Sequence, residues 1–329
     1  MGVALTALAA ALPEKTLENA ELAERLGVTD DWIFARTGIL SRRVVGPNDT
    51  SSSLATAAGR RALEQSGVEP EQLDLVIVAT CTSDYQMPAT ATLVAAALGA
   101  RNAGAFDTNA ACSGFLFALA QGTALVEAGT VRRVLVCGAD VLTRFTDPTD
   151  IGSCILFGDG AGAALIEHFD GPSRVGPFSM RADGSRPELL WISPETGTLR
   201  MEGREVYRHA VEAMTSSVQE LLKDTSLTLD DIDLLVAHQA NARILKAVAD
   251  RLGFPSERVV TNIARIGNTS AASIPLAIAD AVESGVVKDG DRIVLTAFGA
   301  GFTWGAGLIE WGRGPAGTPK YAVVEQRDA

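Results

Sequence analysis

Cys112 is the first candidate for chemistry among the four cysteines of this 329-residue chain. It lies in Asn-Ala-Ala-Cys-Ser-Gly-Phe at 109–115, where a turn of small residues leads into an apolar, helix-like stretch. A helix N-terminus offers free N–H groups and partial positive charge, which lower the pKa of a thiol and favour the nucleophilic thiolate. Cys112 is therefore a candidate nucleophile. The alternative is a small buried apolar residue, the usual role of a free cysteine.

His238 is the candidate among three histidines, because it directly follows the apolar run at 234–237 and opens His-Gln-Ala-Asn. Ligands of α/β proteins bind at the carboxyl ends of strands, so a histidine at that point is well placed for a site. The alternative is a histidine on a solvent-facing loop. His168 and His209 have polar, charged neighbours, and we assign them no role.

The elements that must position these residues alternate between strands and helices. Short apolar runs predict strands at 75–79, 133–137, 155–157, 234–237 and 292–296, and stretches such as 53–66 and 243–252 predict helices. Runs that are apolar throughout are typical of strands covered on both faces. The alternation indicates a layered α/β fold.

The chain also repeats itself. Residues 62–79 resemble residues 221–238 at an offset of 159, and residues 126–131 resemble 282–287 at an offset of 156. We interpret this as an internal duplication, with chance similarity as the alternative. The 159 offset pairs His238 with Ala79, and the 156 offset pairs Cys112 with Asn268. We therefore expect two helix N-termini, one at Cys112 and one at Asn268, to face each other.

Composition and charge exclude several classes of function. The formal net charge of −12 disfavours general binding of nucleic acid or an anionic membrane. No apolar run reaches the roughly 18 residues of a membrane helix, and the first residues lack the basic segment of a secretory signal. The cysteines form no C-x-x-C pair, which disfavours a metal site. We expect a cytoplasmic protein that binds neither nucleic acid nor membrane.

Taken together, four motifs resemble the β-ketoacyl-acyl carrier protein synthase III family. They are the segment at 109–115, His-Gln-Ala-Asn at 238–241, Gly-Asn-Thr-Ser-Ala-Ala-Ser-Ile-Pro at 267–275 and Ala-Phe-Gly-Ala-Gly-Phe-Thr-Trp-Gly at 297–305. The resemblance covers about residues 3–311. It implies a thiolase-like fold, with two duplicated halves in a five-layered αβαβα core, and a homodimer. We place the halves at 1–168 and 169–311, followed by a disordered tail at 312–329.

The resemblance also implies the chemistry. Cys112 would take an acyl group from an acyl-CoA, with the backbone N–H groups of Cys112 and Ala300 as the oxyanion hole and Phe298 beside them. His238 and Asn268 would hold the thioester of malonyl-acyl carrier protein during decarboxylative Claisen condensation, which initiates fatty acid or polyketide synthesis. The thioesters are substrates, so no cofactor is implied.

Asn268 also separates related functions. Elongating condensing enzymes carry a second histidine here, and degradative thiolases need a second cysteine in the C-terminal glycine-rich loop, which 297–305 lacks. Asn268 therefore favours condensation. The alternatives are a starter-unit synthase or acyltransferase of a secondary pathway, and an inactive scaffold partner. The intact Cys112, His238 and Asn268 argue against the scaffold.

The resemblance implies three further groups of contact residues. CoA or phosphopantetheine would meet Trp32, Arg36, Arg208, Asn241 and Arg243. An acidic carrier protein would meet a basic patch of Arg243, Lys246 and Arg251; the alternative for this patch is a solvated helix face. The acyl pocket would be formed by Met87, Leu142 and Phe157, with Met87 reaching in from the second subunit. Ile151 stands where the family usually has an arginine that stacks on adenine. The softer Met87 predicts tolerance of longer or branched primers; the alternative is a methionine that only fills the dimer interface.

Overall fold

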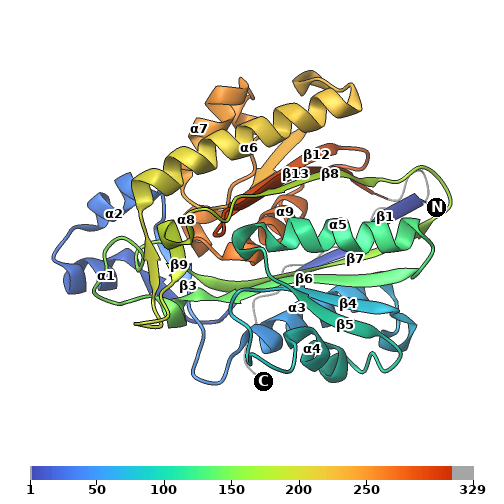
Figure 1. The fold of residues 1–329 in the computed structure, drawn as a ribbon, viewed down its shortest axis with the longest axis horizontal. Helices are drawn as coiled ribbons and strands as arrows, with labels where there is room; N and C mark the ends of the chain where they lie inside the picture. The colour runs from blue at the N-terminus through green and yellow to red at the C-terminus, as the bar shows by residue number, and fades with distance from the viewer. Residues whose placement is uncertain (1, 313–329) are drawn as a thin grey trace.

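The computed structural model describes residues 2–312, which form two large β-sheets separated and covered by helices, and two small sheets of two strands each (Figure 1). The first sheet has the order β1-β7-β6-β4-β5. Strand β4 is parallel to β5 and β6, whereas β7 is antiparallel to β6 and β1. The strands are β1 (Gly2–Ala11), β4 (Leu75–Ala79), β5 (Gly104–Thr108), β6 (Arg133–Val141) and β7 (Asp159–Phe169).

The second sheet repeats this arrangement in the order β11-β12-β13-β8. Its strands are β8 (Val175–Ala182), β11 (Leu234–Ala237), β12 (Arg292–Gly299) and β13 (Thr303–Glu310). Strand β11 is parallel to β12, and β13 is antiparallel to β12 and β8, so the four correspond to β4, β6, β7 and β1. In the first sheet β5 lies beside β4. At the equivalent position beside β11, the second sheet has only a single parallel bridge, which joins Leu235 to Val259. The topology supports the duplication, while the boundary at 168/169 stays a prediction.

Six longer helices complete the five layers. Helices α3 (Ser51–Ser66) and α4 (Thr90–Leu98) cover the outer face of the first sheet, and α6 (Gly203–Thr225) and α7 (Ala242–Leu252) that of the second. Helices α5 (Gly114–Glu127) and α9 (Ser273–Glu283) lie between the sheets (Figure 1). The predicted αβαβα thiolase-like architecture is confirmed. The smaller elements are β2 (Thr16–Glu18), α1 (Asn19–Leu26), α2 (Asp30–Thr37), β3 (Ser41–Arg43), β9 (Leu190–Ile192), β10 (Leu199–Met201) and α8 (Ile263–Ile266).

The sequences of the helices match their layers. Helix α5 reads GFLFALAQGTALVE and α9 reads SIPLAIADAVE; both are apolar on most sides because a sheet covers each side. Helix α7, ARILKAVADRL, buries one face with Ile244, Leu245 and Val248 and turns its charged residues outward. The middle layer also requires a glycine. A Cβ at Gly138 on β6 would lie 2.5 Å from the carbonyl oxygen of Ala271, so only glycine allows this approach.

Four of the five strand predictions are confirmed, and the one at 155–157 is wrong. That segment forms turns, with one isolated bridge from Phe157 to Asn268. Its side chains are apolar because they line a cavity. The fully buried Arg42 fixes the segment at 155–157, because its guanidinium donates a hydrogen bond to the carbonyl oxygen of Ile155 at 2.7 Å.

The predicted pairing of Cys112 with Asn268 is also wrong. Short 3-10 turns precede both central helices, at Ala111–Ser113 and at Ser270–Ala272, and they are 159 residues apart. Cys112 therefore corresponds to Ala271. The offset of 156 arises because α5 has 14 residues and α9 only 11, so it holds at the C-terminal ends of the helices and not at their N-terminal ends.

The described residues, 2–312, contain no helix that is both long and apolar enough to cross a membrane. Within the same range, no cluster of three or more His, Cys, Asp or Glu side chains could hold a metal ion. The predicted tail at 312–329 lies outside the described residues, apart from Gly312.

Candidate active site

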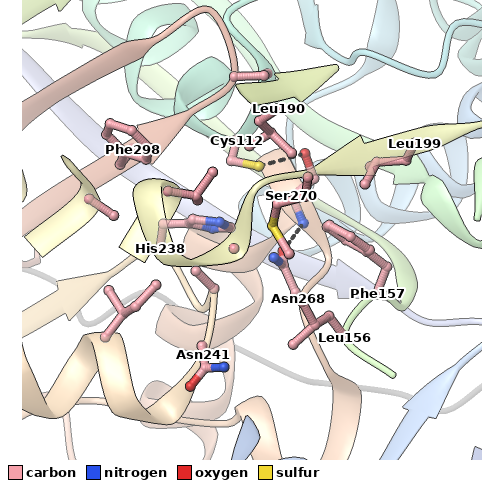
Figure 2. Close-up of a pocket in the computed structure, with 18 of the residues that line it drawn as sticks. Cys112, Leu156, Phe157, Leu190, Leu199, His238, Asn241, Asn268, Ser270 and Phe298 are labelled. Atoms are coloured by element: carbon pink, nitrogen blue, oxygen red, sulfur yellow. Dashed lines mark hydrogen bonds between the residues drawn. The ribbon is translucent and has the colours of Figure 1, made fainter. Parts of the chain in front are cut away.

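A cavity of about 950 Å³ lies beside the turns that precede α5 and α9 and the loop that follows β11. Cys112, His238 and Asn268 all line it (Figure 2). Each comes from a different segment. Cys112 lies in the turn before α5, His238 follows β11, and Asn268 stands two residues before the turn that leads into α9. Cys112 and Asn268 come from equivalent regions of the two halves, so the duplication places them on either side of one pocket.

Cys112 lies on a tightly packed turn. A Cβ at Gly299, the last residue of β12, would come within 2.7 Å of the Cys112 backbone nitrogen, so this glycine lets the strand end against the nucleophile. The thiol does not show the lowered pKa that the sequence predicts. Burial raises the pKa of the Cys112 thiol to about 12, while a hydrogen bond from Ser270 works in the opposite direction. Burial is the largest of these effects, and the resting thiol is protonated.

Asn268 is oriented by its own turn. Its Oδ1 accepts a hydrogen bond from the backbone N–H of Ser270 at 2.9 Å. The other half repeats this contact, since Asn109 Oδ1 accepts from the N–H of Ala111 at 3.2 Å, again at an offset of 159. Because the oxygen of Asn268 is engaged, its amide N–H₂ is left as the donor of this side chain.

His238 is buried and neutral. Its Nδ1 lies 2.6 Å from Ser273 Oγ, which accepts a hydrogen bond from the backbone N–H of Gln239. We infer that the Ser273 hydroxyl donates to Nδ1, which leaves the proton of the imidazole on Nε2. Burial lowers the pKa of His238 to about 3. Together with Asn268, this histidine supplies the cavity with an uncharged N–H donor.

The neutral His238 predicts a loss of stability in acid. The unfolded chain takes up a proton at this histidine near pH 6.5, and the folded chain only near 3. The free energy of unfolding should therefore fall as the pH falls through this window, by up to about 1.4 kcal/mol per pH unit from this group. Urea unfolding of the wild type and His238→Gln between pH 6 and 4 measures the difference. Parallel pH dependences would contradict the buried neutral state.

The mouth of the cavity is basic and aromatic. The guanidinium of Arg36 lies 4.0 Å from the ring centroid of Trp32, and that of Arg243 lies 5.7 Å from the ring of Tyr207. Asn241 joins these two regions, since its Nδ2 donates to the carbonyl oxygen of Arg36 at 3.0 Å while its Oδ1 caps α7. Rings and guanidinium groups of this kind suit a ligand that is both aromatic and anionic.

The structure brings most of the predicted site residues together. The cavity is lined by Trp32, Arg36, Cys112, Leu142, Phe157, His238, Asn241, Arg243, Asn268, Phe298 and Ala300, and by Ile151. The other four lie outside its lining. Arg208 pairs with Glu205 at 2.8 Å and Lys246 with Asp250 at 2.7 Å, whereas Arg251 is exposed and Met87 is 86% exposed. The roles assigned to these residues stay predictions.

Other lining residues were missed by the sequence analysis. Ser270 lies two positions after Asn268 inside a motif already singled out, so its position was a usable signal. Arg204 on α6 adds a third basic side chain to the lining, and Cys81 adds a second thiol. The β9–β10 hairpin contributes Leu190 and Leu199, for which the sequence carries no recognisable signal.

Two matched half-folds that bring the Cys112 thiol, the neutral His238 and Asn268 into one cavity define a condensing enzyme of the thiolase fold. Two family models match the chain: 3-oxoacyl-[acyl-carrier-protein] synthase III at residues 106–184, and the C-terminal region of the same family at 222–311. The chain belongs to the 3-oxoacyl-[acyl-carrier-protein] synthase III family, and it is an acyltransferase. The predicted family and enzyme class are confirmed.

Individual relatives agree with this assignment. The β-ketoacyl-[acyl-carrier-protein] synthase III of Rhizorhabdus wittichii is 46% identical over 92% of this chain and 97% of its own length. A solved synthase III from Aquifex aeolicus is 41% identical with a TM-score of 0.92, and covers 94% of this chain and 100% of its own. The priming β-ketosynthase of the R1128 polyketide pathway is 37% identical with a TM-score of 0.90, covering 94% and 96%.

Proposed function

We propose that this enzyme condenses an acyl-CoA primer with malonyl-acyl carrier protein, and so initiates fatty acid synthesis. The observation that carries the proposal is the content of one cavity: a single nucleophile on a helix-entry turn, facing two uncharged N–H donors, behind a basic and aromatic mouth. Neutral donors suit a reaction in which negative charge develops on a thioester oxygen. No separate cofactor is needed, because both substrates are activated thioesters.

In the first step, the Cys112 sulfur attacks the thioester carbonyl of the acyl-CoA. A bond forms between this sulfur and the acyl carbon, the bond from the acyl carbon to the CoA sulfur breaks, and the thiol proton passes to the leaving CoA. Because the pKa of Cys112 is raised, the proton leaves the sulfur only during the attack, as the departing CoA sulfur becomes able to accept it. The backbone N–H groups of Cys112 and Ala300 would hold the oxyanion.

In the second step, the malonyl group loses CO₂, and the electrons of the broken bond move into the enolate of the thioester. The Nε2–H of His238 and the side-chain N–H₂ of Asn268 would donate to the enolate oxygen. The carbanion then attacks the acyl carbon on Cys112. The bond from this carbon to sulfur breaks, the β-ketoacyl carrier protein leaves, and Cys112 takes up a proton from water.

Mass spectrometry after incubation with acetyl-CoA tests the first step. Cleavage by trypsin places Cys81 and Cys112 in different peptides, 62–101 and 102–132. We expect one acyl adduct, on peptide 102–132. No adduct with any of a series of acyl-CoAs would overturn the proposed donor.

The same series of acyl-CoAs tests the role of Met87. A strict preference for acetyl-CoA would contradict the predicted tolerance of longer or branched primers.

The basic residues of α7 support an acidic partner. Arg243 lies at the cavity mouth and Arg251 at the exposed far end of the same helix, so the path from mouth to surface is locally basic despite the net charge of −12. Such a patch attracts an acidic carrier protein.

Reversing one of these charges should weaken use of the carrier protein selectively. Arg251→Glu should raise the KM for malonyl-carrier protein about tenfold and leave acylation by acyl-CoA unchanged. Arg101→Glu, beside α4 on the opposite outer layer, is the matched control (Figure 1). Steady-state kinetics at two salt concentrations measures both. An equal effect of the two variants would show that total charge, rather than the patch, is responsible.

A homodimer completes the proposal. Met87 and Tyr85 are 86% and 58% exposed on one loop, which is unusual for large apolar residues and suits a surface covered by a second copy.

We place the enzyme in the cytoplasm. The second candidate function is priming of a secondary pathway; the likeness to the R1128 priming ketosynthase and the apolar Ile151 at the mouth favour it.

A further inference from the structure

Ser270 has no part in the chemistry described above, yet its side chain touches the nucleophile. Its hydroxyl donates a hydrogen bond to Cys112 Sγ with an Oγ–Sγ distance of 3.4 Å (Figure 2). The residue is fully buried, and its backbone has φ +51°, which is uncommon for a residue other than glycine. A strained backbone that aims a buried hydroxyl at a reactive sulfur is typical of a functional site.

The surroundings direct the single hydroxyl proton toward Cys112. The other sulfur nearby, Cys81 Sγ, is farther from Ser270 Oγ, at 3.9 Å. The Cys81 thiol itself points to Asp140, with its Sγ 3.4 Å from Oδ1, and the Cys81 backbone N–H donates to the same oxygen at 2.9 Å. Cys81 is thus occupied as a donor, and the shorter contact leaves Cys112 as the acceptor for Ser270.

The turn that carries Ser270 is clamped on both sides. Its backbone N–H is held by Asn268 Oδ1, and the next N–H, of Ala271, donates to Oδ2 of the fully buried Asp140 at 3.1 Å. These contacts fix the hydroxyl before a substrate arrives. The equivalent turn of the first half shows that the fold does not require the hydroxyl, since Ala111 stands there with φ +46°.

We propose that Ser270 is a further catalytic residue, whose hydroxyl stabilises the thiolate of Cys112 as it attacks the acyl donor. The proposal rests on the function proposed above. A hydrogen bond to an anionic acceptor is stronger than one to its neutral form, so the contact gains strength as charge develops on sulfur. It also opposes the effect of burial, which raises the pKa of the thiol. No proton leaves Ser270 in this step.

Alkylation of Cys112 by iodoacetamide tests the role without any substrate. Ser270→Ala should slow labelling of peptide 102–132 about tenfold at every pH between 7 and 9, because the thiolate fraction falls by the same factor throughout this range. A purely steric effect would instead speed up the labelling, because removing the hydroxyl opens space beside the sulfur. The variant should fold, since Ala111 shows that alanine adopts this backbone conformation.

Thr269→Val is the matched control. The Thr269 hydroxyl is buried in the same turn, and among the described residues it has no hydrogen-bond partner, so its loss should leave the labelling of Cys112 unchanged. Wild-type labelling rates in Ser270→Ala would overturn the proposal, as would an equal change in Thr269→Val. Acylation by acetyl-CoA should slow by the same factor as labelling. A wild-type enzyme that is labelled but never acylated would instead refute the proposed function and leave the assignment of Ser270 intact.

Discussion

Replacing Cys112 with alanine is expected to abolish acylation by acyl-CoA and to lower the rate of condensation at least about a thousandfold. The reason is that the cavity offers only one thiol on a helix-entry turn. Cys137 and Cys154 are buried in the core, and the Cys81 thiol is directed at Asp140. Burial also raises the pKa of Cys81 well above that of a free thiol, and the charge of Asp140 raises it further.

Cys81→Ala is the control for this result, because it removes the other thiol of the same cavity. It should keep the adduct on peptide 102–132 and most of the activity. An adduct on peptide 62–101 in the Cys112→Ala variant, or condensation that survives in it, would show that the nucleophile has been assigned to the wrong cysteine.

Replacing Asn268 with alanine is expected to separate the two half-reactions. Acylation of Cys112 should remain within a few-fold of the wild-type rate, while condensation with malonyl-carrier protein should fall about a hundredfold or more, the usual cost of losing one donor to a developing oxyanion. Release of CO₂ and formation of the adduct, followed in parallel, measure the two effects.

Asn268→Asp separates donation from turn structure. Its carboxylate can still accept the backbone N–H of Ser270, as Asn268 Oδ1 does at 2.9 Å, but it offers no N–H₂ to the substrate. We expect it to be as inactive in condensation as Asn268→Ala. If aspartate restores condensation, Asn268 serves the turn and another group binds the thioester.

The layers of the fold could be predicted from the sequence because burial on two faces leaves a plain pattern. Strands such as β4 and β11 are apolar throughout and flanked by turn residues, and both lie within a residue-by-residue repeat. The same pattern wrongly predicts a strand at 155–157, because the wall of a cavity is as apolar as a buried strand. Periodicity alone cannot distinguish them.

The sequence predicts which residues line the site, but it does not predict their pKa values. The positions of Cys112, His238 and Asn268 followed from motifs, whereas the raised pKa of the thiol depends on burial between two sheets that are far apart in sequence. The hydrogen bond from Ser270 likewise joins positions 158 residues apart. The correct pairing of the halves at this point required the helix lengths, because a difference of three residues between α5 and α9 shifts the offset.

The most direct test of the central claim is a chase of the isolated acyl-enzyme. Enzyme carrying an acyl group on Cys112, freed of acyl-CoA, is mixed with malonyl-carrier protein and followed by intact-mass spectrometry. We predict that the adduct disappears from the enzyme while CO₂ is released and the carrier protein gains the β-ketoacyl mass, one product for each adduct lost. An adduct that persists, or that is released as free acid without a β-ketoacyl product, would contradict the account.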